Sequence, residues 1–122
     1  MIQMDPGLSR LQESVKGLIK QGRVGDPAVV RWYMRTPATR HRTPDALSEA
    51  MTTIAGDWMG GPAISANVVR SGKELVTHLA YGSGGFAIVT AAIGPGEPAN
   101  DLMVFGSRGA IYHGRTPEGG SL

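Results

Sequence analysis

Apolar residues near the start of the chain recur at steps of three and four, which is the spacing of one face of a helix. These residues are Leu8, Leu11, Val15, Leu18 and Ile19. Asp5 and Pro6 suit the capping and first helical positions, and Gly22 can take the left-handed conformation that ends a helix. The pattern therefore predicts an amphipathic helix followed by a tight turn over 23–27.

A second stretch with helical spacing follows Thr43 and Pro44, which form another favourable helix start. Its apolar positions are Leu47, Ala50, Met51, Ile54 and Trp58. The helix should end at 60–62, because the two glycines permit a turn and the proline cannot continue the helical hydrogen bonds. Residues 36–43, between the predicted strand 28–36 and this helix, are expected to form an exposed loop.

Alternation with a period of two predicts strands over 28–36, 63–70, 75–82, 85–93, 100–105 and 110–113. In the first of them, Val29, Arg31, Tyr33 and Arg35 share one face. Short turns rich in glycine join the later strands, and short turns imply antiparallel pairing. We therefore expect an α+β fold, a mostly antiparallel open sheet of about six strands with two helices on one face.

The segment 86–93 reads Phe-Ala-Ile-Val-Thr-Ala-Ala-Ile and is apolar on both faces. An antiparallel strand with one face in water should alternate apolar and polar residues. Two helices can cover only one side of the sheet, so the other side needs a partner, and the simplest partner is a second copy. The segment predicts a homodimer that associates through the sheet. The alternative is that this face is exposed to solvent, which small alanine side chains permit.

Composition narrows the classes of protein that fit. The 122 residues correspond to one domain, which we assign to 1–122. The chain has no cysteine, which excludes disulfides, thiolate metal sites and a cysteine nucleophile. It shows neither a membrane-spanning apolar stretch nor a secretory signal, so we expect a cytoplasmic protein with no membrane partner. A net charge of +2 is too small to demand a nucleic-acid partner.

Basic residues gather around the end of the first predicted strand. Arg35, Arg40, His41 and Arg42 lie within one short stretch, close after Arg31. They form either a solvated loop or an edge that meets a carboxylate or phosphate. No aromatic residue is interleaved through 40–42, which disfavours RNA binding.

Other candidates for chemistry are few. The histidines at positions 41, 78 and 113 lack the close spacing of metal ligands, so no metal is expected. The glycine-rich segment 82–85 is followed by a strand, whereas a phosphate-binding loop opens a helix. Asp57, on the second helix, and His78, on a strand, are polar side chains that a site could use. Asp57 precedes Trp58 on a helix that must pack on the sheet, which disfavours a catalytic role.

Three stretches resemble the C-terminal domain of the glucose–fructose oxidoreductase/inositol dehydrogenase (Gfo/Idh/MocA) family. Residues 8–35 look like the family's helix, its "I-x-x-G-x-I-G" turn and its first strand. Residues 53–61, which end Asp-Trp-Met-Gly-Gly, are similar to the end of its second helix. Residues 101–113, with Val-Phe-Gly-Ser-Arg-Gly at 104–109, look like its closing "V-x-G-x-x-G" hairpin. Their order and spacing tie most of the chain to the family.

The resemblance implies a domain for substrate binding and oligomerisation. Family members are usually nicotinamide-dependent dehydrogenases, in which a separate Rossmann domain binds the cofactor and carries a catalytic lysine. No counterpart of that domain is found in this sequence. The family's second helix usually carries an aspartate and, four residues later, a histidine. Counted back from Trp58, these places fall near Leu47 and Met51, neither of which can move a proton.

We therefore expect a domain of this oxidoreductase type without its own redox activity and without a cofactor. It would form a dimer and bind a small polar or anionic ligand, or a catalytic partner subunit, near 35–42 and the second helix. One alternative is a cofactor-independent isomerase, lyase or cyclase with a pocket on the open face. Another is a fragment of a dehydrogenase, or a subunit of a split one that works with a separate NAD(P)-binding subunit. The candidate binding residues are Tyr33, Arg35, Arg40, His41, Arg42, Asp57 and His78.

Overall fold

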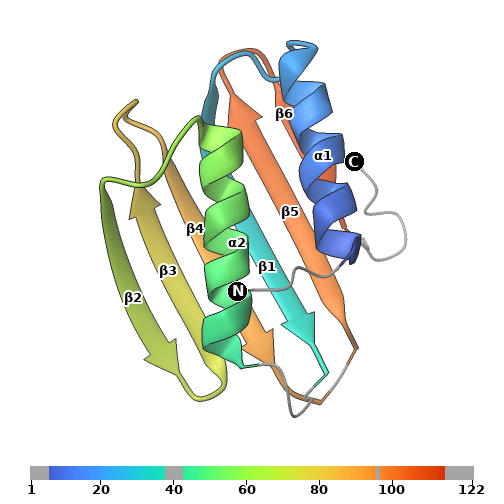
Figure 1. Ribbon diagram of the computed structural model, residues 1–122, viewed down its shortest axis with the longest axis vertical. Helices are drawn as coiled ribbons and strands as arrows, with labels where there is room; N and C mark the ends of the chain where they lie inside the picture. Colours follow the sequence, from blue (N-terminus) through green and yellow to red (C-terminus); the bar gives the residue numbers. More distant parts are fainter. Residues whose placement is uncertain (1–5, 38–42, 96, 115–122) are drawn as a thin grey trace.

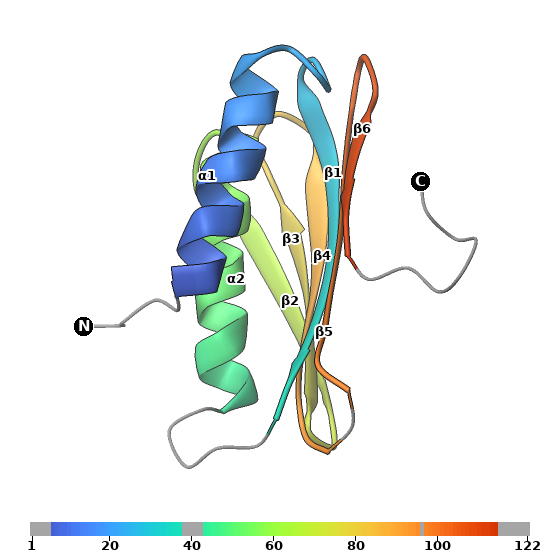
Figure 2. The same cartoon turned by 90° about the vertical axis from the view of Figure 1, so that its right-hand side faces the viewer.

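Two helices lie against one face of a six-stranded sheet in the computed structural model, which describes residues 6–37, 43–95 and 97–114. Figure 2 shows both helices on the same side of the sheet, with nothing from the described residues layered on the other side. Neither described helix is long and apolar enough to span a membrane. The α+β class expected from the sequence is confirmed.

Helix α1 (Pro6–Lys20) buries the apolar stripe expected from the sequence, with Leu8, Leu11 and Val15 almost fully covered. It ends where Gly22 adopts a φ of 82° and donates a backbone hydrogen bond to the Ile19 carbonyl at 3.0 Å. Only glycine takes this left-handed conformation without steric cost. The expected cap at Asp5 lies outside the described residues.

Helix α2 (Pro44–Met59) begins and ends as its sequence predicts. The Thr43 hydroxyl accepts a hydrogen bond from the Ala46 backbone N–H at 3.1 Å, which satisfies one of the free donors of the first turn. At the other end, Gly60 has a φ of 91°. Gly61 then donates to the Gly56 carbonyl at 2.9 Å and closes the last turn.

Each of the six expected strands is present. They are β1 (Pro27–Thr36), β2 (Ser65–Ser71), β3 (Glu74–Ala80), β4 (Phe86–Ile93), β5 (Ala99–Gly106) and β6 (Ala110–His113). Their order in the sheet is β2-β3-β4-β1-β5-β6, so the first strand of the chain lies in the middle (Figure 1). All neighbouring strands run antiparallel except β1 and β4. That parallel pair is possible because the connection between them is long and includes α2.

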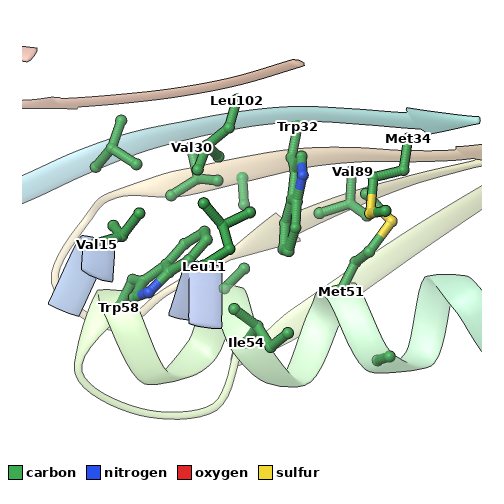
Figure 3. Packing of buried hydrophobic residues seen from close by; sticks show 14 of the residues in the cluster. Leu11, Val15, Val30, Trp32, Met34, Met51, Ile54, Trp58, Val89 and Leu102 are labelled. Atoms are coloured by element: carbon green, nitrogen blue, oxygen red, sulfur yellow. The ribbon is translucent and has the colours of Figure 1, made fainter. Parts of the chain in front are cut away.

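The core lies between the helices and the sheet, and two tryptophans stand at its centre (Figure 3). The rings of Trp32 and Trp58 are 5.1 Å apart at 37°, and both side chains are nearly completely buried. Each indole N–H finds an acceptor. Trp32 donates to the Asn100 side-chain oxygen at 2.7 Å, and Trp58 donates to the Gln12 carbonyl at 3.1 Å. Both buried donors are thus satisfied, as a stable core requires.

The turn after α1 is hydrogen-bonded to the hairpin between β5 and β6. Arg108 N–H donates to the Val24 carbonyl at 2.8 Å, and Ser107 N–H donates to the Asp26 carbonyl at 3.1 Å. The Ser107 hydroxyl accepts from Asp26 N–H at 3.0 Å. The first and last of the three stretches that resemble the oxidoreductase family therefore meet in space, although 81 positions separate Asp26 from Ser107.

Candidate functional site

The side of the sheet without helices, here called the open face, is built by the strand residues that point away from the core. From β1 it receives Val29, Arg31, Tyr33 and Arg35, and the pairing register adds the residues that lie beside them. These neighbours include Phe86, Ile88, Thr90, Ala92, Asp101, Met103 and Phe105. Most of this surface is apolar, which agrees with the two-sided apolar pattern that the sequence shows for β4.

Arg35 is held at one end of the open face. Its Nε donates to the Tyr33 hydroxyl at 3.2 Å, and its Nη1 donates to the Pro95 carbonyl at 3.4 Å. Two oxygen acceptors that carry no formal charge therefore orient this side chain, and a guanidinium held in this way can recognise a carboxylate or phosphate. The other basic candidates of this region, Arg40, His41 and Arg42, lie outside the described residues.

His78 lies exposed on β3 and is flanked in register by Asn67 on β2 and Ile88 on β4. An open hollow of about 420 Å³ surrounds it. Its lining residues are Ser65, Ala66, Asn67, His78, Leu79, Ala80, Phe86 and Ala87. An imidazole, an amide and a hydroxyl thus border an exposed aromatic ring, a combination that suits polar ligands with an apolar surface.

Asp57 does not join the other candidates, because it lies in the helical layer on the opposite side of the sheet. Its carboxylate accepts a hydrogen bond from Gln12 Nε2 at 3.0 Å and pairs with Lys16 Nζ at 3.2 Å. The hydrogen bond from Gln12, followed by the bond and charge of Lys16, holds the pKa of Asp57 below its ordinary value. Asp57 therefore links α2 to α1, and among the described candidates only Tyr33, Arg35 and His78 share the open face.

Two kinds of chemical group can be checked in the described residues, metal ligands and the proton-transfer groups of the second helix. In the described parts of the chain, no group of three or more histidine or carboxylate residues is placed to hold a metal ion. Leu47 and Met51, which lie near the places expected for the aspartate and histidine of the resembled family, are 5% and 0% exposed. The described part of this helix thus offers no proton-transfer group at those places.

Three exposed aromatic side chains gather at one end of the open face, and two of them, Phe105 and Tyr112, were not among the candidates from the sequence. Phe86, Phe105 and Tyr112 are 45%, 36% and 47% exposed. The rings of Phe105 and Tyr112 meet edge to face, with centroids 6.4 Å apart at 87°. The alternation within each strand could have placed each ring on a face, but only the strand order shows that β4 and β5 flank β1 and that β6 lies beside β5.

Charged residues are scattered over the open face in balanced numbers. Arg31 and Arg35 lie on β1, Asp101 pairs in register with Tyr33, and Glu74 pairs with Ala92. Among the described residues of the strands, two basic and two acidic side chains thus stand among apolar neighbours. A surface of this kind can meet a copy of itself without accumulating charge of one sign.

Neither family models nor curated proteins give a match to this sequence, but solved structures do match its fold. The myo-inositol 2-dehydrogenase of Lactobacillus plantarum superposes with a TM-score of 0.73 at 15% identity, over 87% of this chain and 40% of that one. A probable dehydrogenase of Thermotoga maritima superposes with a TM-score of 0.69 at 19% identity, over 91% of this chain and 40% of that one. The scyllo-inositol dehydrogenase of Lactobacillus casei, solved with NAD(H) and scyllo-inositol, has a TM-score of 0.65 at 14% identity. The match covers 94% of this chain and 42% of that one.

The chain therefore spans about two-fifths of the length of these dehydrogenases, an extent consistent with their C-terminal domain alone. At such low identity the likeness concerns the fold. The resemblance predicted from the turn, the second helix and the closing hairpin is confirmed at that level, because inositol dehydrogenases are among the matching structures.

Proposed function

We propose that this chain is a self-associating binding module with the fold of an oxidoreductase C-terminal domain, and that it has no redox activity of its own. The observation that carries the proposal is the open face, a broad and mostly apolar surface that no described element covers. Its partner would be a second copy of the chain. The end near Arg35 would bind a small polar or anionic ligand or a catalytic subunit.

Self-association is supported by the composition of the open face. Exposed Phe86, Phe105 and Tyr112 lie on the same surface as Arg31. Aromatic residues and arginine are enriched in the centres of protein interfaces, where they contribute a large share of the binding free energy. The balance of Arg31 and Arg35 against Glu74 and Asp101 permits two copies to face each other.

The lack of redox activity is supported by the second helix. A hydride transfer needs a bound cofactor and a group that takes or supplies the proton of the substrate hydroxyl. Leu47 and Met51 are buried hydrocarbon and thioether side chains, and Asp57 is engaged by Gln12 and Lys16. The open-face candidates Tyr33, Arg35 and His78 lie on the other side of the sheet from this helix.

Association is tested with Ile88→Lys, which places a charge at the centre of the open face. The matched control is Ala46→Lys, at an exposed position of α2 on the helical side. Sedimentation velocity of the full chain should show that the wild type and the control associate, and that Ile88→Lys sediments at a lower mass with unchanged circular dichroism. A wild type that remains monomeric at high micromolar concentration would overturn the proposal.

Cofactor binding is tested by titrating the purified chain with NADH and NADPH and following their fluorescence. We expect no saturable change. Tight binding of either nucleotide would contradict the proposed lack of redox activity, since it would give the chain the electron carrier that such a reaction requires.

A second candidate function is that of one subunit in a split dehydrogenase. It is favoured by the coverage of about two-fifths of the matching enzymes, which leaves room for a separate nucleotide-binding subunit. Affinity purification of the chain from its source should then recover a Rossmann-type protein, and the mixture should reduce NAD(P)+ with a polyol or oxidise NAD(P)H with the corresponding ketone. Recovery of the chain alone would argue against this function.

The cofactor-independent isomerase, lyase or cyclase remains an alternative hypothesis for the open face. Such an enzyme would need a pocket that excludes water around its reacting groups. The hollow beside His78 is open to solvent, and we therefore favour the binding module.

A further inference from the structure

Strand β2 forms one edge of the sheet and is uncovered on both sides. All seven of its residues are exposed, whereas the neighbouring β3 buries Leu75, Thr77 and Leu79 under the helical layer. Figure 1 shows β2 lying beyond α2, which packs on β3, β4 and β1. Val68 and Val69 point to opposite faces and are 55% and 58% exposed, so apolar side chains stand on both sides of the strand.

The hairpin geometry shows which backbone groups of β2 are unpaired in the monomer. A two-residue turn, Gly72-Lys73, joins Ser71 to Glu74, and the residues that close such a turn exchange their backbone hydrogen bonds. Alternate residues of β2, ending with Ser71, therefore bond to β3. The N–H and C=O groups of the residues between them, Ala66, Val68 and Arg70, point away from the sheet.

Natural edge strands are usually protected from pairing by prolines, bulges, inward-pointing charges or covering loops. The register of β2 with β3 is unbroken from Ser65 to Ser71, and the strand contains no proline and no lysine. Its one charged residue is Arg70, whose guanidinium pairs with the Asp45 carboxylate at 2.8 Å. The edge is thus largely neutral and carries no device that would repel a second strand.

We propose that β2 pairs edge to edge with β2 of a second copy, antiparallel and centred on Val68. In this register Val68 lies opposite its own counterpart, and Ala66 lies opposite the other copy's Arg70. The three outward-pointing residues then exchange backbone hydrogen bonds, and two β-branched side chains meet on the twofold axis. Arg70 never faces another Arg70, so the pairing brings no like charges together.

The edge pairing is independent of association through the open face, because it uses the rim of the sheet and not its surface. A chain that uses both contacts forms a closed tetramer of stacked continuous sheets where the two twofold axes intersect, and a longer assembly where they do not. A chain that uses one of them forms a dimer. An isolated edge of this kind could instead accept an extended peptide of another protein, and the variants below separate that outcome from self-pairing.

Charges at Val68, which lies on the twofold axis of the proposed pair, test the edge pairing. Val68→Lys and Val68→Glu each place two like charges opposite each other in the homodimer, which should weaken edge pairing at least tenfold. When the two variants are mixed, opposite charges meet and pairing should return. Val68→Thr, which keeps the branched shape and the backbone donor, is the matched control. The measurement is sedimentation velocity of the full chain, carried out in both the wild-type and the Ile88→Lys background.

In the Ile88→Lys background the expected species is a dimer that Val68→Lys converts to a monomer and that the mixture restores. An Ile88→Lys chain that is monomeric at every concentration would overturn the edge pairing and leave the open-face association standing. Loss of mass with Val68→Lys that the mixture fails to restore would also overturn it, because two β2 strands that pair with each other should regain their contact when opposite charges meet. Unaltered circular dichroism shows that each variant is folded.

Discussion

At the scale of single residues, the contact of Asp57 with α1 has a measurable effect on stability. Asp57→Asn removes the charge that pairs with Lys16, so we expect the free energy of unfolding at pH 7 to fall by about 0.5–1 kcal/mol. The estimate is modest because the two side chains are 30% and 37% exposed and solvent screens the pair. Urea denaturation measures the change, and Glu13→Gln, an exposed carboxylate on α1, is the control.

The same pair predicts a pH dependence of definite sign. The folded protein lowers the pKa of Asp57 below its ordinary value, so the unfolded chain takes up this proton first as the solution is acidified. The stabilisation is complete at neutral pH, declines as the pH falls past the ordinary value near 3.8, and vanishes below the folded pKa. The difference between wild type and Asp57→Asn should therefore shrink in acid. A difference that grew in acid would contradict this assignment.

Tyr81 has a buried hydroxyl whose removal, in contrast to that of the Asp57 charge, should not lower the free energy of unfolding. Its side chain is 5% exposed, and its hydroxyl has no hydrogen-bond partner among the described residues. Burial also raises the pKa of this phenol. Tyr81→Phe should leave the free energy of unfolding unchanged or raise it by up to about 1 kcal/mol. Thermal denaturation measures the change, and Tyr33→Phe, which removes one of the two acceptors of Arg35, should give no gain in the same experiment.

At the scale of elements, the motifs that resemble the oxidoreductase family are sites where two segments approach closely. A Cβ atom on Gly106 would collide with the Val24 carbonyl oxygen and lie 2.8 Å from that of Asp26. Both obstacles are backbone atoms and cannot rotate away. We expect Gly106→Ala to lower the free energy of unfolding by about 2 kcal/mol or more.

Gly17 provides the matched control for that substitution. It lies inside α1, and a Cβ atom there would meet nothing within 4 Å. Because alanine favours the helix more than glycine does, Gly17→Ala should raise the free energy of unfolding by about 0.5–1 kcal/mol. Opposite signs for the two variants in one urea titration series would support the docking of the turn on the hairpin. Equal effects would contradict it.

The helices and strands were predictable because their signals are local. Thr43 and Pro44 mark the start of α2, and the alternation of residues 28–36 defines both faces of β1. The order of the strands was not predictable, since the pairing of β1 with β4 and β5 depends on contacts between distant parts of the chain. The same limit explains why Asp57 was considered together with His78. The helical spacing of the residues around Asp57 places it on α2 but does not reveal that Gln12 and Lys16 of α1 lie beside it.

At the scale of the whole molecule, the open face combines features that are each unremarkable in sequence. The apolar pattern of 86–93 indicated an unpartnered side, but the aromatic cluster and the balanced charges became visible only when β1 was placed at the centre. Arg35 and Tyr33 were correctly placed on one face by alternation. The hydrogen bond from Arg35 to the Pro95 carbonyl depends on the connection between β4 and β5, which no local pattern describes.

Self-association through the open face should couple to folding, and this coupling is measurable in the thermal stability. If the folded chains associate and the unfolded chains do not, the apparent melting temperature rises with protein concentration. For a dimer that melts to unfolded monomers, each tenfold increase in concentration adds about 1.4 kcal/mol per mole of dimer. Calorimetry over a hundredfold range of protein concentration should show this increase in melting temperature for the wild type and for Ala46→Lys. Ile88→Lys should reduce this rise in melting temperature with concentration. The double variant Ile88→Lys/Val68→Lys should show no rise. A melting temperature that stays constant with concentration for the wild type would show that the open face is not buried in a stable assembly.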